Sequence, residues 1–583
     1  MRRRLVFFTA LLAVSITTAC REPDGLGAAS SGDSDSNPES QAIVHVKDFG
    51  AVADDGECDV AGITDAIAAV QGKPGSVIVF DAGVYNLKED SATRRNNHLA
   101  MIHLRDLEGI TLRGATTPDG EPATVLEMNL ELDNDVTGAT HIDIRNGRDI
   151  RIENLVLDHS PRFATAAEIV AIDQDADIVE IEVLPGMPHF DGMMSYSANN
   201  WDLDKRLLVR NPALTIGVDQ GAFRQWEKIA GEERRYRIAG SGFSNRVATG
   251  EGISFHFNVI AGDARTVDVY GSEDIVFENI YIHSTIGMSL GAGDNRNMTF
   301  RRFHIKPEGN SLAVGPRDGF HINRSTGRLL MDDVVVKGVR WDPIVSYTQS
   351  RKVVERAGES SIRLSPGGVL NLLREGAEVI FWTGEIPHTA VVKERDQDGI
   401  VEFTAPLPQS VSAGTHFTPD AWIWDEAIIR NSLVEANYGT AIVYQSANLL
   451  VEDSVFRNNS YTNIGLGPTS GGAGVFAWNI VIRNNLFEQS TWDEKYRNSV
   501  SAHRGTITMF QHHPDFGSEA YNRNILIEDN TFRDLDVGEH AAAIHVKNAQ
   551  EVTIRDNRYE NVNNEVIIDP DSTRNVQEEG SRR

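Results

Sequence analysis

The chain has 583 residues, of which 40% are hydrophobic and 50 are glycine, so it has ample material for a large core and for many turns. Its formal net charge of -29 argues against nucleic acid and anionic membrane surfaces as partners, because an acidic surface repels phosphate. Neutral glycans are not repelled, although the same charge also serves solubility in an extracellular medium.

The first 20 residues are predicted to be a secretion signal. Three arginines precede an apolar run from Leu5 to Val14, and small residues lead up to Cys20. This pattern resembles a bacterial lipoprotein signal, in which Cys20 is lipidated after cleavage. It predicts a secreted lipoprotein at the outer membrane or cell surface of a bacterium, with the lipid anchor as its only membrane contact. Residues 21–42, rich in Ser, Gly and Asp, predict a flexible linker.

The folded body is predicted to open with a cap. Residues Val46–Val52 are followed by an amphipathic helix at Ile63–Val70 and a strand at Val77–Tyr85. A helix in this place covers the open end of a stack of strands, which otherwise exposes unpaired backbone groups.

A six-residue phrase recurs along most of the body. Each copy has a polar residue, an alternating β-branched run, and then an acid or arginine before Asn or Asp. The copies are Asp149–Asn154, Asp274–Asn279, Asn448–Asp453, Asn479–Asn484, Asn524–Asp529 and Glu551–Asp556, and the last four precede the aromatic residues Phe456, Phe487, Phe532 and Tyr559. Alternation predicts strands, and Asn or Asp tolerates the left-handed backbone of a corner. Because one strand cannot bury its face alone, the repeats predict an all-β fold, a right-handed parallel β-helix.

Two stretches lack the phrase and predict inserted antiparallel β-barrels or sandwiches, because their short alternating segments are separated by Gly, Pro and Asp turns. Whether they form walls of a substrate pocket or pack as decoration is open. The predicted organisation is a signal peptide (1–20), a linker (21–42), the first β-helical part with its cap (43–170), the first insertion (171–262), central coils (263–350), the second insertion (351–425), C-terminal coils (426–567) and a disordered tail (568–583).

Polar residues gather in the central coils. Asp318 and Asp342 lie 24 residues apart, close to one coil, so we expect them to stack beside one groove. Glycosidic cleavage needs two such carboxylates, and their mutual repulsion raises one pKa, which yields an acid and a base. Stereochemistry stays open, since a separation of about 5 Å favours retention and about 6.5–9.5 Å favours inversion. The structural alternative is an Asx turn or a corner ladder.

Side chains that hold sugars surround this pair, because aromatic rings and amides bind hydroxyl-rich ligands. The candidate substrate-binding residues are Arg317, His321, Asn323, Trp341, Tyr347 and Gln349. Weaker candidates are Asp158, His159 and Arg162, which also fit a coil corner, and Glu435, Tyr438 and Gln445. The pairs Asn484-Asn485 and Asp529-Asn530 are interpreted as turn ladders.

His512 and His513 with Asp515 suggest a metal, but adjacent histidines on a strand point apart and a third ligand with recognisable spacing is missing. We therefore interpret this segment as a loop. Neither a metal nor any other cofactor is predicted.

Several segments, in order, resemble glycoside hydrolase family 110, the β-helical α-1,3-galactosidases of the pectate-lyase-like superfamily. They are Asp48–Ala51, Val156–Ser160, Glu168–Ile172, Ser284–Met288, Asp318–His321 with Gly327, and Leu407–Val411. The resemblance implies an exo-acting, inverting, metal-independent hydrolase of terminal α-galactosides, with Asp318 and Asp342 as catalytic residues and an oligo- or polysaccharide as substrate.

The chain also departs from the family pattern. The family has an Asp-Asp pair where this chain has Trp341-Asp342, and an Asn and His near the position of Ser346-Tyr347. The family's later Trp-Glu region reads Gly471–Val475 here. Two alternatives therefore stay open: a polysaccharide lyase on the same scaffold, and a noncatalytic glycan-binding solenoid. The oligomeric state is not predicted.

Overall fold

The structure is a computed structural model that describes residues 41–88, 93–95, 98–129, 139–195, 197–210, 224–240, 242–256, 264–365, 367–468, 474–493, 505–516, 519–537 and 541–581. The predicted signal peptide, the Cys20 lipidation site and nearly all of the linker lie outside these residues. Within the described ranges, no helix combines the length and apolar character needed to span a membrane.

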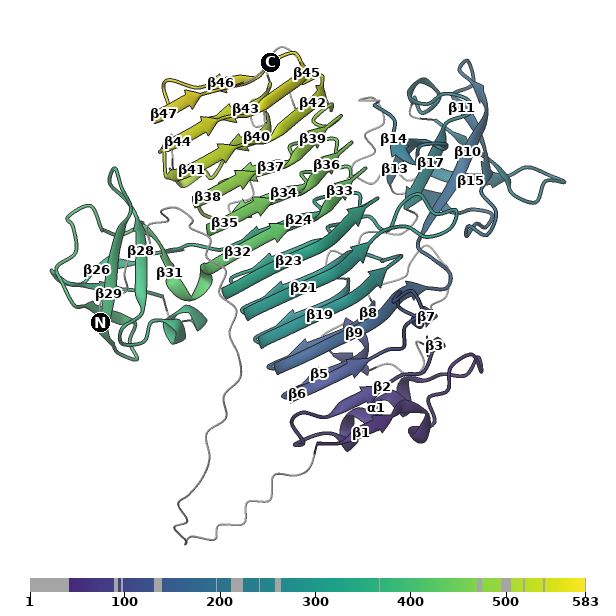
Figure 1. Cartoon of the computed structure of the whole chain (residues 1–583), viewed down its shortest axis with the longest axis horizontal. Coiled ribbons are helices and arrows are strands. Elements are labelled where there is room, and N and C mark those ends of the chain that lie inside the picture. Colours follow the sequence, from purple (N-terminus) through teal and green to yellow (C-terminus); the bar gives the residue numbers. More distant parts are fainter. Residues whose placement is uncertain are drawn as a thin grey trace, which may run out of the picture. The chain divides into compact units, whose positions relative to one another are not determined.

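The chain winds into coils that build two long sheets (Figure 1). Sheet 1 contains β1 (Ile43–His45), β2 (Val77–Val79), β3 (Gly83–Lys88), β6 (Glu108–Arg113), β7 (Thr124–Asn129), β9 (Arg148–His159), β19 (Glu273–Ile282), β21 (Arg296–Ile305), β23 (Thr326–Lys337), β32 (Trp424–Arg430), β33 (Leu433–Glu435), β35 (Ala447–Glu452), β36 (Val455–Arg457), β38 (Trp478–Arg483), β39 (Leu486–Glu488), β41 (Asn522–Glu528), β42 (Thr531–Leu535), β44 (Ala549–Arg555), β45 (Arg558–Val562) and β47 (Thr573–Glu579).

Sheet 2 contains β4 (Thr93–Arg95), β5 (His98–Arg105), β8 (Ala139–Arg145), β18 (Arg265–Tyr270), β20 (Met288–Gly293), β22 (Phe320–Asn323), β24 (Ile344–Tyr347), β34 (Ile442–Gln445), β37 (Ile464–Leu466), β40 (Gly505–Met509), β43 (Ala542–Val546) and β46 (Val566–Ile568). Apart from the antiparallel β4–β5 pair, the strands of both sheets pair in parallel. The predicted fold class, a right-handed parallel β-helix with a cap and two inserted β domains, is confirmed.

All six copies of the recurring phrase lie in sheet 1, and their polar ends turn the chain. The first and last residues of each copy adopt positive φ, for example 58° at Asn479 and 54° at Asn484. Behind the corners at Asn484, Asp529 and Asp556, buried asparagines form a ladder in which Asn485 Nδ2 donates to Asn530 Oδ1 at 3.0 Å and Asn530 Nδ2 donates to Asn557 Oδ1 at 3.1 Å. The predicted turn ladders are therefore present.

The aromatic residues that follow the phrase form a column inside the coils. Phe456, Phe487, Phe532 and Tyr559 stack with successive centroid distances of 5.0, 5.0 and 5.3 Å. This spacing matches that of neighbouring strands, about 4.8 Å, because equivalent side chains of parallel in-register coils lie directly above one another.

The N-terminal cap consists of η1 (Val46–Phe49) and α1 (Val60–Ala69). The helix buries Val60, Ile63, Ala66 and Ile67 against the first coils. Gly62 allows the closest approach, because a Cβ there would overlap the backbone at Phe49–Ala51. The sequence placed this helix three residues later, at Ile63–Val70.

The first insertion is an antiparallel sheet of β10 (Ala164–Asp173), β11 (Ile178–Val183), β12 (Met194–Ser195), β13 (Ser197–Asp202), β14 (Leu207–Leu208), β15 (Arg224–Lys228), β16 (Arg235–Ala239) and β17 (Gly252–His256), with η3 (Ser244–Arg246). Its first strand begins before the predicted boundary at 171, because Ala164–Ala167 is buried strand without β-branched alternation. Its core merges with that of the coils.

The second insertion contains β25 (Arg351–Lys352), β26 (Glu355–Arg356), β27 (Ser361–Arg363), β28 (Glu378–Trp382), β29 (His388–Arg395), β30 (Ile400–Phe403) and β31 (His416–Pro419), with η4 (Gly368–Leu372) and η5 (Asp420–Trp422). It has a separate core around Phe381, Phe403 and Phe417. A third apolar cluster joins it to the coils, where Trp382 packs against Phe476 and Trp478 at centroid distances of 5.5 Å.

The expectation of a disordered tail at 568–583 is wrong for most of its length. Residues Thr573–Glu579 form β47, which pairs in parallel with β44, and Val576 packs against the core. The segment is too polar to be recognised as a strand by its sequence, but the last coil offers an unpaired edge that it covers.

Candidate active site

Asp318 and Asp342 lie at the same corner of two successive coils. Strands β22 and β24 pair in parallel with Phe320 opposite Ile344, and each aspartate stands two residues before its strand. Between the coils, the backbone N–H of Gly319 donates to the carbonyl oxygen of Asp342 at 3.1 Å. The predicted stacking of the two aspartates is therefore present.

The two oxygens of Asp318 have different partners. Oδ2 lies 2.6 Å from Nδ1 of His321, and Oδ1 accepts a 3.3 Å hydrogen bond from the backbone N–H of Asp342. Only 3% of the Asp318 side chain is exposed, compared with 25% for His321. The expectation that both carboxylates border an open groove is therefore wrong for Asp318, because its side chain is buried and its Oδ2 is in contact with His321 of β22.

Asp342 is half-buried, and its surroundings favour the protonated form of its carboxyl group. Burial, and after it the negative charge of Asp318, raises the pKa of Asp342 to about 8. The backbone N–H of Thr440, which donates to Oδ1 at 2.7 Å, and the charge of Arg317 act in the opposite direction. A carboxyl group that remains protonated at pH 7 can serve as a general acid.

Three of the predicted substrate-binding residues lie on the outer face of sheet 2. Strand β22 turns Phe320 and Ile322 into the core, so His321 and Asn323 point outward. Tyr347 of β24 also lies on this face, where its ring meets that of His321 edge-on at a centroid distance of 5.4 Å. These contacts place an aromatic ring and an amide next to the Asp318–His321 pair.

The other three predicted substrate-binding residues, Arg317, Trp341 and Gln349, lie around this face. Arg317 and Trp341 directly precede the two aspartates, and both are half-buried. The Trp341 ring approaches Tyr461, two coils further on, edge-on at 6.5 Å. Gln349 lies beyond the end of β24, where its Oε1 is 3.4 Å from Nη1 of Arg324.

Two residues of β18, Arg265 and Tyr270, also lie beside this site, although no motif in the sequence indicates them. Tyr270 brings its hydroxyl to 3.5 Å from Nδ2 of Asn323. A Cβ on Gly291 would overlap the side chain of Arg265, and a Cβ on Gly293 would overlap the ring of Tyr270. Both side chains therefore lie across the bare backbone of β20. Two glycines in one strand are the signal that could have revealed this close approach.

The weaker candidates have structural explanations. Arg162 donates to both oxygens of Asp158, at 2.6 and 3.2 Å, and Ser284 Oγ donates to Oδ1 at 2.6 Å. His159 is buried next to this group, and burial lowers its pKa to about 3, which keeps it neutral. These contacts fit a coil corner.

Of the three candidates after the second insertion, only Glu435 lies in the other sheet, whereas Gln445 is opposite Tyr347 in the β24–β34 pair. Glu435 belongs to sheet 1, where it binds Lys337 at 2.7 Å and Arg457 at 3.2 Å. Tyr438 and Gln445 are buried. A surface hollow of ≈ 710 Å³ lies elsewhere, lined by residues such as Arg210 of the first insertion and Asp534, Tyr559 and Asn561 of the C-terminal coils.

Comparison with known proteins gives distant relatives over most of the chain. Alpha-1,3-galactosidase B of Bacteroides thetaiotaomicron is 21% identical over 556 residues, covering 85% of this chain and 83% of the relative. Alpha-1,3-galactosidase B of Akkermansia muciniphila is 21% identical, with 85% and 64% covered, and alpha-1,3-galactosidase A of Bacteroides fragilis strain YCH46 is 21% identical, with 85% and 84% covered. The chain is thus related to glycoside hydrolases, which confirms the expected enzyme class.

No protein-family model matches the chain. Among solved structures, the A-module of the Azotobacter vinelandii mannuronan C-5 epimerase AlgE6 gives a TM-score of 0.42 at 12% identity, covering 93% of this chain and 99% of that one. An exopolygalacturonase from Thermotoga maritima gives 0.41 at 11% identity, with 93% and 91% covered.

Proposed function

We propose that this chain is an exo-acting, inverting glycoside hydrolase that releases a terminal α-linked galactose from a galactose-containing oligo- or polysaccharide. The substrate class is supported by the three alpha-1,3-galactosidases that share 21% identity with 85% of the chain. The observation that carries the mechanism is the raised pKa of Asp342, about 8, beside Asp318 on the neighbouring coil.

In this mechanism Asp342 is the general acid. Its proton passes to the glycosidic oxygen as the bond between that oxygen and the anomeric carbon breaks. Because Thr440 holds Oδ1 of Asp342, the proton resides on the other oxygen, Oδ2.

The base is the pair formed by His321 and Asp318. Asp318 accepts from Nδ1 of His321, which leaves Nε2 able to take a proton from water as the water oxygen bonds to the anomeric carbon. Asp318 is buried and both its oxygens are occupied, so it is badly placed to attack a sugar itself. This arrangement favours attack by water, and therefore inversion of the anomeric centre.

Tyr347, Tyr270 and Asn323 would hold the sugar on the outer face of sheet 2. Aromatic rings present apolar faces to the C–H side of a pyranose, and an amide can bind its hydroxyl groups. Arg265 lies across β20 in the same area, where its guanidinium can donate to further hydroxyl groups.

We also propose that the mature protein is anchored by a lipid on Cys20 and reaches its glycan through the linker at 21–42. A Cys20→Ala variant should then move from the membrane fraction to the soluble fraction of the cells that produce it. Retention of the variant in the membrane would contradict the anchor without touching the proposed hydrolysis.

The decisive experiment incubates the protein with a panel of aryl α- and β-glycosides and with α-1,3-galactosyl disaccharides, and follows the products by proton NMR. We expect release of galactose that first appears as the β-anomer. Asp342→Asn should lack this activity, whereas Asp425→Asn, a change of an exposed aspartate, should retain it.

Three other outcomes would overturn the proposal in distinct ways. The α-anomer as first product would exclude inversion. Unsaturated uronates, which absorb in the ultraviolet, would indicate a lyase. Binding of galactosides without any product would indicate a noncatalytic glycan-binding solenoid.

A further inference from the structure

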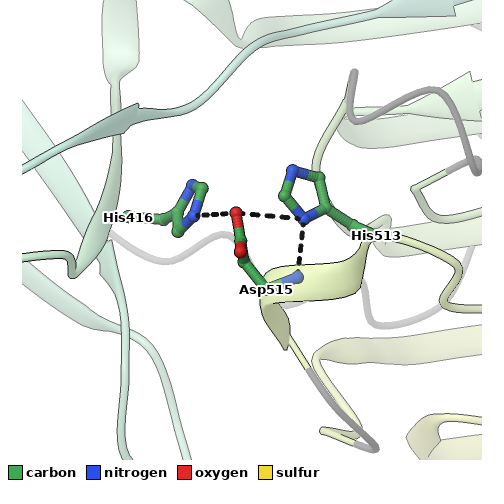
Figure 2. A group of neighbouring side chains, drawn as sticks. All are labelled: His416, His513 and Asp515. Carbon is green, nitrogen blue, oxygen red and sulfur yellow. Dashed lines mark hydrogen bonds and ion pairs between the residues drawn. The ribbon is translucent and has the colours of Figure 1, made fainter.

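Three potential metal ligands from distant parts of the chain meet outside the candidate active site. His416 opens β31 of the second insertion, whereas His513 and Asp515 lie at η6 (Pro514–Phe516) between β40 and β41 of the coils. One ligand atom from each residue lies within 4.8 Å of the others, and Figure 2 shows the two rings on either side of the Asp515 carboxylate.

The surroundings orient the His416 ring toward this centre. Ser350 Oγ lies 2.7 Å from Nδ1, and Nε2 lies 3.2 Å from Oδ2 of Asp515. A hydrogen bond at one ring nitrogen that directs the other nitrogen to the ion is the usual arrangement of metal-binding histidines. Phe516 packs against both imidazoles at centroid distances of 4.8 Å and forms an apolar wall.

The cluster is closed on the histidine side and open on the carboxylate side. The side chains of His416 and His513 are 9% and 6% exposed, whereas that of Asp515 is 41% exposed. Two imidazoles and a carboxylate with an open fourth position match the ligand number and type that Zn²⁺ accepts, with water completing the tetrahedron.

An ion would have to displace contacts made by Lys352 and by the backbone of Asp515. Lys352 places Nζ 2.9 Å from Oδ2 of Asp515, so its ammonium now supplies the positive charge at the carboxylate. The backbone N–H of Asp515 donates to Nδ1 of His513 at 3.2 Å and competes for that lone pair. Lys352 is a half-exposed side chain and can swing into solvent.

We propose that His416, His513 and Asp515 bind one divalent transition-metal ion of the Zn²⁺ type, which ties the second insertion to the C-terminal coils. Its ligands come from both sides of the contact that Trp382 and Trp478 already hold together. The ion adds a polar cross-link to that apolar contact and takes no part in the proposed hydrolysis. The sequence missed the site because His416 lies 99 residues before Asp515.

The test titrates the chelator-treated full-length protein with ZnCl₂ in a calorimeter. We expect one equivalent to bind with a micromolar or lower Kd. His416→Ala and His513→Ala should each weaken binding at least tenfold, whereas His512→Ala, a change of the adjacent histidine, should not. Each variant is first compared with the parent by circular dichroism without metal, so that a misfolded variant is replaced by His416→Gln or His513→Gln.

Lys352→Met provides a second, independent measurement. Removing the competing ammonium should tighten Zn²⁺ binding severalfold, and Zn²⁺ should raise the melting temperature of both the parent and this variant. Absence of binding up to about a hundred micromolar ZnCl₂ in both proteins would overturn the proposal. Binding that survives the His416 and His513 changes would do so as well.

Discussion

Sheet 1 repeats one regular pattern of side chains coil after coil, whereas the outward side chains of sheet 2 change from coil to coil around the candidate active site. On sheet 1, the exposed Arg483 and Arg555 bind Glu452 and Glu528 at the equivalent position of the preceding coil. On the outer face of sheet 2, successive coils instead present Tyr270, then bare glycine backbone, then His321 and Asn323, then Tyr347. A repeated side-chain pattern stabilises the packing between neighbouring coils. Where the pattern is absent, the outward side chains are available to bind a ligand.

His321→Asn should give the largest effect, and it tests whether sheet 2 can lose catalysis without loss of stability. The amide can still donate to Asp318, so the fold should keep its melting temperature, but the proposed base is lost. We expect kcat to fall by about 10²–10⁴-fold, the usual worth of general acid–base catalysis. Galactose release under saturating substrate measures this, and an unchanged kcat would remove His321 from the mechanism.

Breaking the aromatic column of sheet 1 should have the converse effect. Phe487→Ala removes a ring that stacks on both sides inside the coils, and we expect the free energy of unfolding to fall by about 3–5 kcal/mol. Denaturant unfolding followed by circular dichroism measures this loss. Activity measured well below the melting temperature should stay close to that of the parent, and a large drop in kcat would show that the sheets are not separable.

Asp342→Asn should change how stability depends on pH. Between the ordinary pKa of an aspartate, near 4, and about 8, the folded protein holds a proton on Asp342 that the unfolded chain releases. The free energy of unfolding of the parent therefore falls as pH rises through this window. The variant has no carboxyl group at this position, so its free energy of unfolding should not fall for this reason. The variant should match the parent near pH 4 and melt at a higher temperature than the parent at pH 8.

The same proton gives a second readout. In the parent enzyme, kcat should decline above about pH 8 as Asp342 ionises. Equal pH dependence of melting in both proteins, together with activity that is flat beyond pH 9, would show that Asp342 does not hold this proton.

The smallest effect is expected within the corners of sheet 1. Asn530→Ala interrupts the buried amide ladder and leaves the backbone N–H of Asn485 without its acceptor, which should cost about 1–3 kcal/mol. Asn524→Gly, at an exposed corner of the same coil, is the control and should cost clearly less, because glycine tolerates the positive φ of this position and the side-chain hydrogen bond to Asn479 is in solvent. Thermal melts of the two variants compare them directly.

Sheet 1 could be predicted because its phrase combines three independent signals. Alternation gives the strand, Asn or Asp gives the left-handed corner, and the following aromatic gives the column. The contact between Asp318 and Asp342 at sheet 2 could also be predicted, because residues one coil apart in the sequence stack on one another in a solenoid. The exposure of Asp318 could not be predicted, because it depends on the tertiary contact with His321. The approach of Arg265 and Tyr270 could not be predicted either, because it depends on the space that Gly291 and Gly293 leave on β20.

The second insertion leaves and rejoins the coils at one place. Its first strand pairs with its last, Arg351 opposite Phe417, and its core is separate from that of the coils. A short turn in its place would let the chain pass from β24 to β32 without altering the winding. Its replacement by such a turn would leave the register between β24 and β34 unchanged, and the loss would fall on the apolar cluster that joins it to the coils.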